Sequence, residues 1–303
     1  MTGQETMLYA LLKRLTRLLS RLPWSVLRNA ARVAAFFFWH LAPDRRNEAV
    51  QAVRKHLKVS DEEAACIARQ SFRENFLSFL EILHTGRFFT AQSVRAVYHP
   101  EVKELLEQET QPIIIVTAHL GSWELMPGLA ADILPRKKGM VVVRSRGNPL
   151  LNSIMAELRG ARGMEAVDHR RASATVLPGL RQGGVAAFLV DHNAGRKEAV
   201  FLPFLEDIAA VNIGPAGMAL RTKAAVYPVF LLRDGKGGHI LHFLPPLHTQ
   251  NLEGSIRERI RTTAAFYTDA VAGMVRMYPE QWFWMHRRWK TRPHDSEDSV
   301  STY

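Results

Sequence analysis

The sequence of 303 residues predicts an α/β fold in which helices flank a mostly parallel central sheet. Short runs rich in valine, isoleucine and other apolar residues recur along the chain, which is typical of buried strands. Stretches with a helical spacing of apolar residues alternate with these runs, and such alternation is typical of parallel sheets. The expected strands are 113–118, 140–144, 185–190, 226–232 and the more alternating 239–244. The expected helices are 122–133, 149–161, 172–182, 213–223 and 255–278.

The segment before the first strand, residues 44–85, has a helical pattern. Ser60 is a preferred capping residue, and Glu63 three positions later completes a helix-start signal. An apolar stripe at helical spacing follows, and we expect it to pack in the core. Its members are Phe72, Phe76, Phe79, Leu80 and Leu83.

The first 42 residues combine arginines with apolar runs. The most apolar stretch, 33–42, is too short to cross a bilayer, because a spanning helix needs about 20 apolar residues. On a helical projection the arginines fall within an arc of about 60°, although Pro23 is expected to reset the helix phase. These arginines are Arg14, Arg17, Arg21, Arg28 and Arg32. The pattern predicts a helical segment lying in the membrane interface, and the alternative is the solvated face of a core helix.

The charge balance points to an anionic partner, since 40 Lys and Arg face 29 Asp and Glu and give a net charge of +11. Nucleic acid is not expected, because the chain has no zinc-finger spacing, RNA-recognition signature or repeated basic helix. The single cysteine, Cys66, cannot form an intrachain disulfide, which suits a reducing compartment. No metal-ligand spacing or glycine-rich nucleotide loop is evident.

The strongest candidate for chemistry is His119, followed by Gly121, Ser122 and Glu124. His119 comes directly after the expected strand 113–118, and ligands of open α/β sheets bind where strands end. An imidazole titrates near neutrality and can accept a proton from a hydroxyl, while a carboxylate can fix its tautomer. The spacing alone is weak, since histidine precedes an acidic residue by five positions four times in this chain. Context alone separates this pair from a structural histidine.

A serine hydrolase is the competing enzyme class, with Ser122 as nucleophile and His119 as its base. The strained Gly-x-Ser-x-Gly elbow is absent, because Trp123 and Glu124 follow the serine. Ser122 is better explained as a helix cap. A basic membrane-binding protein without catalysis is a further alternative, but it leaves His119 and Glu124 at the strand end unexplained.

The order of motifs resembles that of the late (secondary) acyltransferases of lipid A biosynthesis, within the lysophospholipid-acyltransferase-like group. Those proteins carry a His-x4-Asp/Glu dyad after a strand, and His119 and Glu124 match it. The further matching segments are 44–47, 141–163, Asp191-His192-Asn193, 201–206, Gly214-Pro215 and 282–290. The chain departs from the pattern at His192, Glu206 and Asn212, where the family usually has Gln, Gly and a Thr-rich region. These departures leave the acceptor lipid open.

The resemblance implies a general base, His119, oriented and stabilised by Glu124, with no covalent acyl-enzyme and no cofactor beyond the acyl thioester. Backbone amides after Gly121 could stabilise the oxyanion. Arginines suit phosphate or the thioester end of the donor, and Asp191 follows a strand, so it could line the same crevice or cap a turn. The residues expected to contact substrate are Ser122, Trp123, Arg144, Arg159, Arg162, Asp191 and Asn193.

We therefore expect an inner-membrane enzyme with its active site on the cytoplasmic face. It would move a fatty acyl group from acyl carrier protein or coenzyme A to a hydroxyl of a phosphorylated glycolipid, a lipid A precursor. The alternative acceptors are lysophosphatidate, an aminolipid or a mannosylated lipid. The expected organisation is a membrane-associating segment at 1–42, an acyltransferase domain at 43–293 and a disordered tail at 294–303. Within 282–290, indoles and cations predict either a membrane interface or cation–π packing, and His286 is a weak catalytic candidate.

Overall fold

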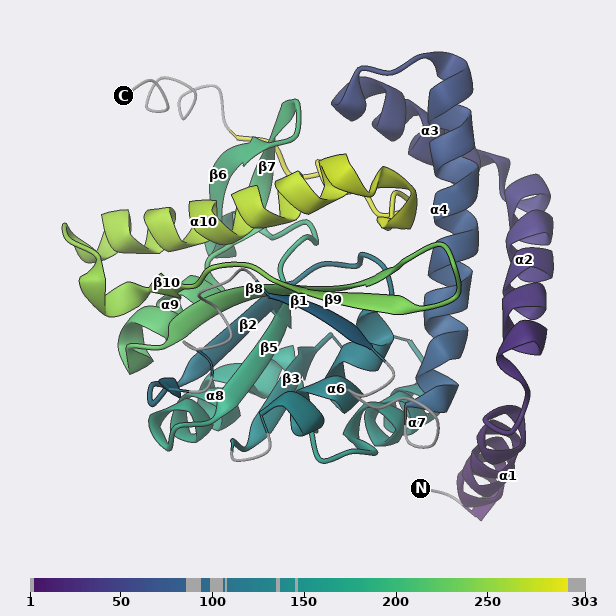
Figure 1. Cartoon of the computed structure of the whole chain (residues 1–303), viewed down its shortest axis with the longest axis horizontal. Helices are drawn as coiled ribbons and strands as arrows, with labels where there is room; N and C mark the ends of the chain where they lie inside the picture. Colours follow the sequence, from purple (N-terminus) through teal and green to yellow (C-terminus); the bar gives the residue numbers. More distant parts are fainter. Residues whose placement is uncertain are drawn as a thin grey trace.

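The computed structural model describes residues 3–85, 94–98, 106, 108–134, 137–144 and 147–293. The described strands form a central sheet in the order β1-β9-β8-β2-β5-β3-β4, and β10 also pairs with β8. These strands are β1 (Arg95–Tyr98), β2 (Ile113–Thr117), β3 (Gly139–Val143), β4 (Glu165–Asp168), β5 (Val185–Leu189), β8 (Ala225–Arg233), β9 (His239–Phe243) and β10 (Leu247–His248). All described pairs in the sheet are parallel except β8–β9 and β8–β10. The predicted fold, a mostly parallel sheet flanked by helices, is thus confirmed (Figure 1).

Helices cover both faces of the sheet, because successive side chains of β2 are buried in two different cores. Ile113 and Ile115 face a core with α6, whereas Ile114 and Val116 face a larger core built with α4, α8, α9 and α10. The helices are α3 (Pro43–Leu57), α4 (Asp61–Glu81), α6 (Met126–Ile133), α7 (Pro149–Gly160), α8 (Ala172–Arg181), α9 (Gly214–Thr222) and α10 (Ile256–Met277). The short 3-10 turns are η1 (Ile82–His84), η3 (Trp123–Leu125), η4 (His169–Arg171), η5 (Arg196–Glu198), η6 (Thr249–Asn251) and η7 (Pro279–Gln281).

The predicted strands and helices are found within a few residues of their expected bounds. The sequence analysis missed β1, β4, β10 and the antiparallel hairpin of β6 (Ala199–Phe204) and β7 (Asp207–Asn212). β4 has only four residues of mixed polarity, and β6 contains Pro203, which argues against a strand. The hairpin also turns through Leu205 at φ 55 rather than through a glycine or asparagine. Short length and atypical turn chemistry hid these elements.

Helix α4 confirms one expectation and corrects another. The backbone N–H of Glu63 donates to Ser60 Oγ at 3.1 Å, so the predicted cap is present. Phe72 is fully buried, as expected for the apolar stripe, but Phe79 leaves 46% of its surface exposed. The stripe is therefore a core face for only part of its length.

The N-terminal residues form α1 (Gly3–Leu19) and α2 (Trp24–Leu41), and α2 runs alongside α4 (Figure 1). Pro23 caps α2, which confirms the predicted break in helix phase. Both helices present large apolar side chains to solvent, among them Leu11, Phe36 and Phe37 at 61%, 60% and 56% exposure. Among the described helices, none is both long and apolar enough to cross a bilayer. The polar tail after residue 293 lies outside the described residues.

Candidate active site

Strand register brings His119 and Asp191 together. β2 and β5 are parallel neighbours with Thr117 opposite Leu189, the last paired residues of each strand. His119 and Asp191 each follow two positions later, at the same carboxyl edge of the sheet. The His119 backbone N–H donates to Asp191 Oδ2 at 2.9 Å, and His119 Nδ1 lies 2.8 Å from Asp191 Oδ1. The Asp191 carboxylate thereby fixes both the backbone and the ring of His119.

Asp191 is fully buried, and Trp282 Nε1 also donates to its Oδ2 at 2.8 Å. Burial alone would raise the pKa of this carboxyl, but the His119 charge and hydrogen bonds hold the pKa far below its ordinary value. For His119, burial lowers the pKa, and the Asp191 charge and hydrogen bond outweigh that effect, so the pKa lies above its ordinary value. The pair therefore favours an ionised carboxylate and makes the imidazole more basic than usual.

Glu124, the carboxylate predicted to orient His119, is paired with an arginine and not with the His119 ring. It stands on η3 with 4% of its surface exposed, and Arg159 of α7 binds it through two hydrogen bonds. Arg159 Nε donates to Glu124 Oε2 at 2.8 Å and Nη2 to Oε1 at 2.6 Å. The group at His119 Nδ1 is thus Asp191, which corrects the expected pairing. Glu124 still contributes to the raised pKa of His119 through its charge.

Aromatic side chains surround the exposed edge of His119, whose side chain is 30% accessible. The Trp123 ring lies edge-on with its centroid 5.5 Å from the imidazole, and the Phe283 ring lies 6.0 Å away. Phe79 packs edge-on against Trp123 at 5.7 Å and against Phe283 at 6.3 Å. Because Phe79 is nearly half exposed, this group gives an apolar approach to the imidazole.

The C-terminal segment 282–290 packs against this site. Phe283 N–H donates to His119 O at 2.9 Å, and Trp282 bridges to Leu120. Trp282, Trp284 and Arg288 are at most 2% exposed, and the Arg288 guanidinium lies 5.0 Å over the Phe204 ring. The cation–π interpretation of this segment is therefore confirmed. His286 contacts the Asp191 carbonyl at 3.1 Å through Nε2, and burial lowers its pKa to about 4.

The turn after His119 was predicted to supply oxyanion donors and a helix cap, but it is closely packed and its backbone N–H groups are already hydrogen-bonded. Gly121 at φ +64 lies against β8, where an added Cβ would sit 2.2 Å from Leu231 O, so glycine is required. The N–H groups of Gly121 and Ser122 donate to Gln281 O and Leu231 O, so neither is available to an oxyanion. Ser122 is fully buried and its hydroxyl makes no described hydrogen bond. It stands at the N-cap position of η3, but its side chain makes no capping hydrogen bond there.

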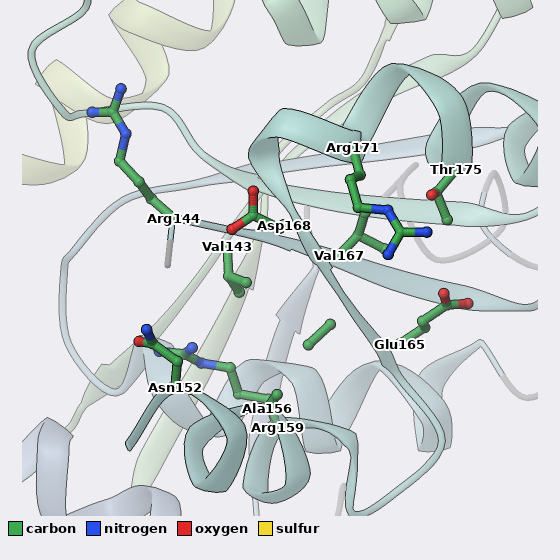
Figure 2. Close-up of a pocket in the computed structure, with 11 residues that line it drawn as sticks. Val143, Arg144, Asn152, Ala156, Arg159, Glu165, Val167, Asp168, Arg171 and Thr175 are labelled. Atoms are coloured by element: carbon green, nitrogen blue, oxygen red, sulfur yellow. The ribbon is translucent and has the colours of Figure 1, made fainter. Parts of the chain in front are cut away.

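A polar cavity of about 250 Å³ opens between α7, α8 and the ends of β3 and β4, at the same carboxyl edge of the sheet. In Figure 2, Arg159 and Asn152 come from α7, Arg171 from the turn before α8, and Arg144 from the residue after β3. Arg144 and Arg171 are exposed. The cavity therefore adjoins the Arg159–Glu124 pair, and its lining combines the guanidinium groups of Arg144 and Arg171 with the carboxylates of Glu165 and Asp168.

Two more predicted substrate contacts, Arg162 and Asn193, do not line this cavity and form hydrogen bonds within the protein. Arg162 Nε donates to Gly128 O at 3.1 Å, and its guanidinium pairs with Asp132 on α6. The Asn193 amide exchanges two 2.9 Å hydrogen bonds with Thr291 and so anchors the C-terminal segment. Of the predicted substrate contacts, Arg144 and Arg159 line the cavity, and Trp123 and Asp191 adjoin His119. Across the described residues no cluster of His, Cys, Asp and Glu side chains could hold a metal ion.

Comparison with known proteins identifies the family. The profile of the bacterial lipid A biosynthesis acyltransferases matches residues 5–291. The chain belongs to this acyltransferase family. It is 30% identical to the lipid A biosynthesis lauroyltransferase of Escherichia coli (strain K12) over 62% of this chain and 59% of that protein. It is 26% identical to the palmitoleoyltransferase of the same strain, over 82% and 80% of the two chains. A Haemophilus influenzae lipid A biosynthesis acyltransferase is 24% identical over 92% and 89%.

Proposed function

We propose that this acyltransferase moves a fatty acyl group from an acyl thioester to a hydroxyl of a phosphorylated glycolipid, a lipid A precursor. The observation that carries the proposal is the His119–Asp191 contact at a half-open, aromatic-lined edge of the sheet. The family supports the reaction class, and relatives named for lauroyl and palmitoleoyl transfer support a fatty acyl group. The proposed site of action is the cytoplasmic face of the inner membrane.

In the proposed reaction, His119 Nδ1–H donates to Asp191, which leaves Nε2 as the proton acceptor. Nε2 removes the proton of the acceptor hydroxyl as its oxygen attacks the thioester carbonyl. The carbonyl carbon–sulfur bond then breaks, and the departing thiolate takes the proton from the imidazolium. Asp191 remains ionised throughout and stabilises the imidazolium, as its depressed pKa requires.

Glu124 is proposed to act on the reaction through Arg159 and through its charge, not through a hydrogen bond to the imidazole. Its two hydrogen bonds fix the Arg159 guanidinium at the border between His119 and the polar cavity. That cavity is proposed to hold an anionic part of a substrate, with Arg144 and Arg171 as further cationic contacts. Acyl carrier protein and coenzyme A both remain candidate donors, because each carries its acyl thioester on an arm that ends in a phosphate.

The deciding experiment measures acyl transfer by purified variants, with an acyl-carrier-protein thioester and a lipid A precursor as substrates. His119→Ala should abolish turnover with its fold intact by circular dichroism. The matched control is His248→Gln, since His248 lies on β10 beside the start of β8, away from the catalytic edge. Turnover retained by His119→Ala would refute the proposed base.

The same assay separates the acceptors. Lysophosphatidate, an aminolipid and a mannosylated lipid are offered in parallel with the lipid A precursor, and labelled products are identified by mass spectrometry. Transfer to one of these lipids in preference to the precursor would replace the proposed acceptor. Repeating the assay with coenzyme A thioesters ranks the donors.

A further inference from the structure

A second cavity of about 300 Å³ lies between α2, α4 and the turn that joins β8 to β9. Its lining shares no residue with the cavity beside His119. Four arginines contribute to its wall, Arg28 and Arg32 from α2, Arg73 from α4 and Arg233 from the end of β8. The acyl-transfer mechanism uses none of these side chains.

Carboxylates of the described residues neutralise one of these four arginines and leave the other three unpaired. Arg233 donates to Glu74 at 2.7 Å and to the buried Glu81 at 2.6 Å. Within the described part of the chain, Arg28, Arg32 and Arg73 form no ion pair, and Glu280 is the remaining carboxylate of the wall. The wall therefore keeps an excess of positive charge. Guanidinium groups present paired N–H donors, a geometry that matches phosphate oxygens.

The wall of this second cavity combines a fixed indole with a glycine turn that lets other groups approach its backbone closely. Trp24 lies edge-on to the His239 ring at 5.8 Å and tilted over the His84 ring at 5.4 Å, so its indole is held in place. Opposite it, Gly235 and Gly237 adopt φ +73 and +100, values that favour glycine. A Cβ added at Gly237 would lie 3.7 Å from Arg28 Nη1, so this guanidinium rests against the side-chain-free turn.

The face of α2 turned away from this cavity indicates which kind of surface the helix meets. Val26, Val33, Phe36 and Phe37 are exposed by 43%, 55%, 60% and 56% on the same helix that carries Arg28. Apolar side chains on an amphipathic helix enter the interfacial region of a bilayer, and arginines of that helix then meet lipid phosphates. We propose that this cavity binds the headgroup phosphate of an anionic membrane lipid that is not the reacting lipid. The site would fix the orientation of the enzyme on the membrane.

The test compares vesicle binding by the full-length protein, with vesicles of phosphatidylcholine alone and vesicles that also contain phosphatidylglycerol. Arg28→Gln/Arg32→Gln/Arg73→Gln should lose about 10- to 100-fold of the preference for phosphatidylglycerol, because each interfacial cation adds several-fold to binding. The matched control is Arg14→Gln/Arg17→Gln/Arg21→Gln, which removes three exposed N-terminal charges outside the cavity. It should lose only a few-fold. An equal loss in both triple variants would overturn the proposal.

Titration calorimetry with soluble ligands separates a lipid site from a simple anion site. Short-chain phosphatidylglycerol should bind saturably to the wild type and weakly to the triple variant, and inorganic phosphate should bind less tightly than the lipid. Inorganic phosphate binding as tightly as the lipid would overturn the lipid assignment. The single variant Arg73→Gln, changed at an exposed position of α4, should weaken lipid binding several-fold and guards against misfolding of the triple variant.

Discussion

Two buried ionic clusters hold the same turn of the chain from opposite sides, and only one of them is suited to chemistry. On one side Asp191 binds the backbone and ring of His119. On the other side Arg233 binds Glu81, and its Nη2 also donates to Ser78 Oγ at 2.7 Å. Ser78 in turn donates to the carbonyl of Gly121, two residues after His119.

The difference between the clusters lies in the partner of the carboxylate. Asp191 faces an imidazole, which titrates near neutrality and is 30% exposed, so a proton can leave and return. Glu81 faces the Arg233 guanidinium, which does not deprotonate, and its own side chain is fully buried. Its second partner, the His239 ring at 3.4 Å, is only 6% exposed, so this imidazole is closed to substrate. Burial would raise the pKa of Glu81, but the Arg233 charge and the hydrogen bonds hold it at about 2. The first cluster can exchange protons, while the second fixes the position of the turn.

The sharpest test of this contrast is Asp191→Asn. An amide cannot stabilise the imidazolium and can hold the wrong tautomer, so turnover should fall about 10³- to 10⁴-fold. The free energy of unfolding should change much less than the barrier to reaction does. The measurement is acyl transfer under saturating substrate together with a urea melt. Turnover within tenfold of wild type would show that Asp191 does not assist the base.

The counterpart in the other cluster is Glu81→Gln, for which stability and not chemistry should suffer. Removing one partner of a buried ion pair leaves an uncompensated charge, so we expect a loss of about 3 kcal/mol in the free energy of unfolding. Because the folded pKa of Glu81 is depressed, its contribution is present above the ordinary pKa and is lost as pH falls toward about 2. The variant should therefore lose part of the acid sensitivity of the wild type.

Chemical denaturation of Glu81→Gln and of the exposed control Glu253→Gln across this pH range provides the measurement. Activity per folded molecule should stay near that of the wild type at neutral pH. A large drop in activity without a loss of stability would place Glu81 in the chemistry and remove the contrast between the clusters.

The sequence predicted most of the sheet because its central strands are uniformly apolar, as in β2 and β8. It also singled out His119 and Asp191, but not their contact. That contact depends on β5 lying beside β2, although β3 and β4 separate them along the chain. Because both residues follow a buried strand, the sequence did predict that Asp191 could line the same crevice as His119.

Local spacing instead favoured Glu124, which the structure pairs with Arg159 from α7. The pairing depends on how η3 and α7 pack, and no local pattern encodes that. The same limit applies to the segment 282–290, whose indoles and cations suit a membrane interface in sequence, although tertiary packing buries Trp282, Trp284 and Arg288. The residue type predicts what kind of partner a side chain needs, and the packing of the fold determines which residue becomes that partner.

The pH dependence sharpens the contrast between a titrating and a fixed cluster. Since the pKa of His119 is raised and the base must be neutral, kcat/KM should rise with pH through a midpoint above 6.5. Asp191→Asn removes the main charge that raises this pKa, so the midpoint should move to lower pH. The ring titration of His119 can be followed by NMR, with His119→Ala identifying its signal. A midpoint unaffected by Asp191→Asn would break the proposed coupling.

The smallest expected effect is at Phe79, on the open side of the catalytic cluster. Its side chain is 46% exposed and meets Trp123 edge-on, so Phe79→Ala should cost little stability but should remove apolar surface beside His119. We expect KM for a long-chain acyl donor to rise a few-fold, with kcat nearly unchanged and short-chain donors unaffected. The matched control is Phe37→Ala, an equally exposed phenylalanine on α2. If both variants raise KM alike in detergent, the effect is one of general apolar surface, and the open edge of His119 is not where the acyl chain lies.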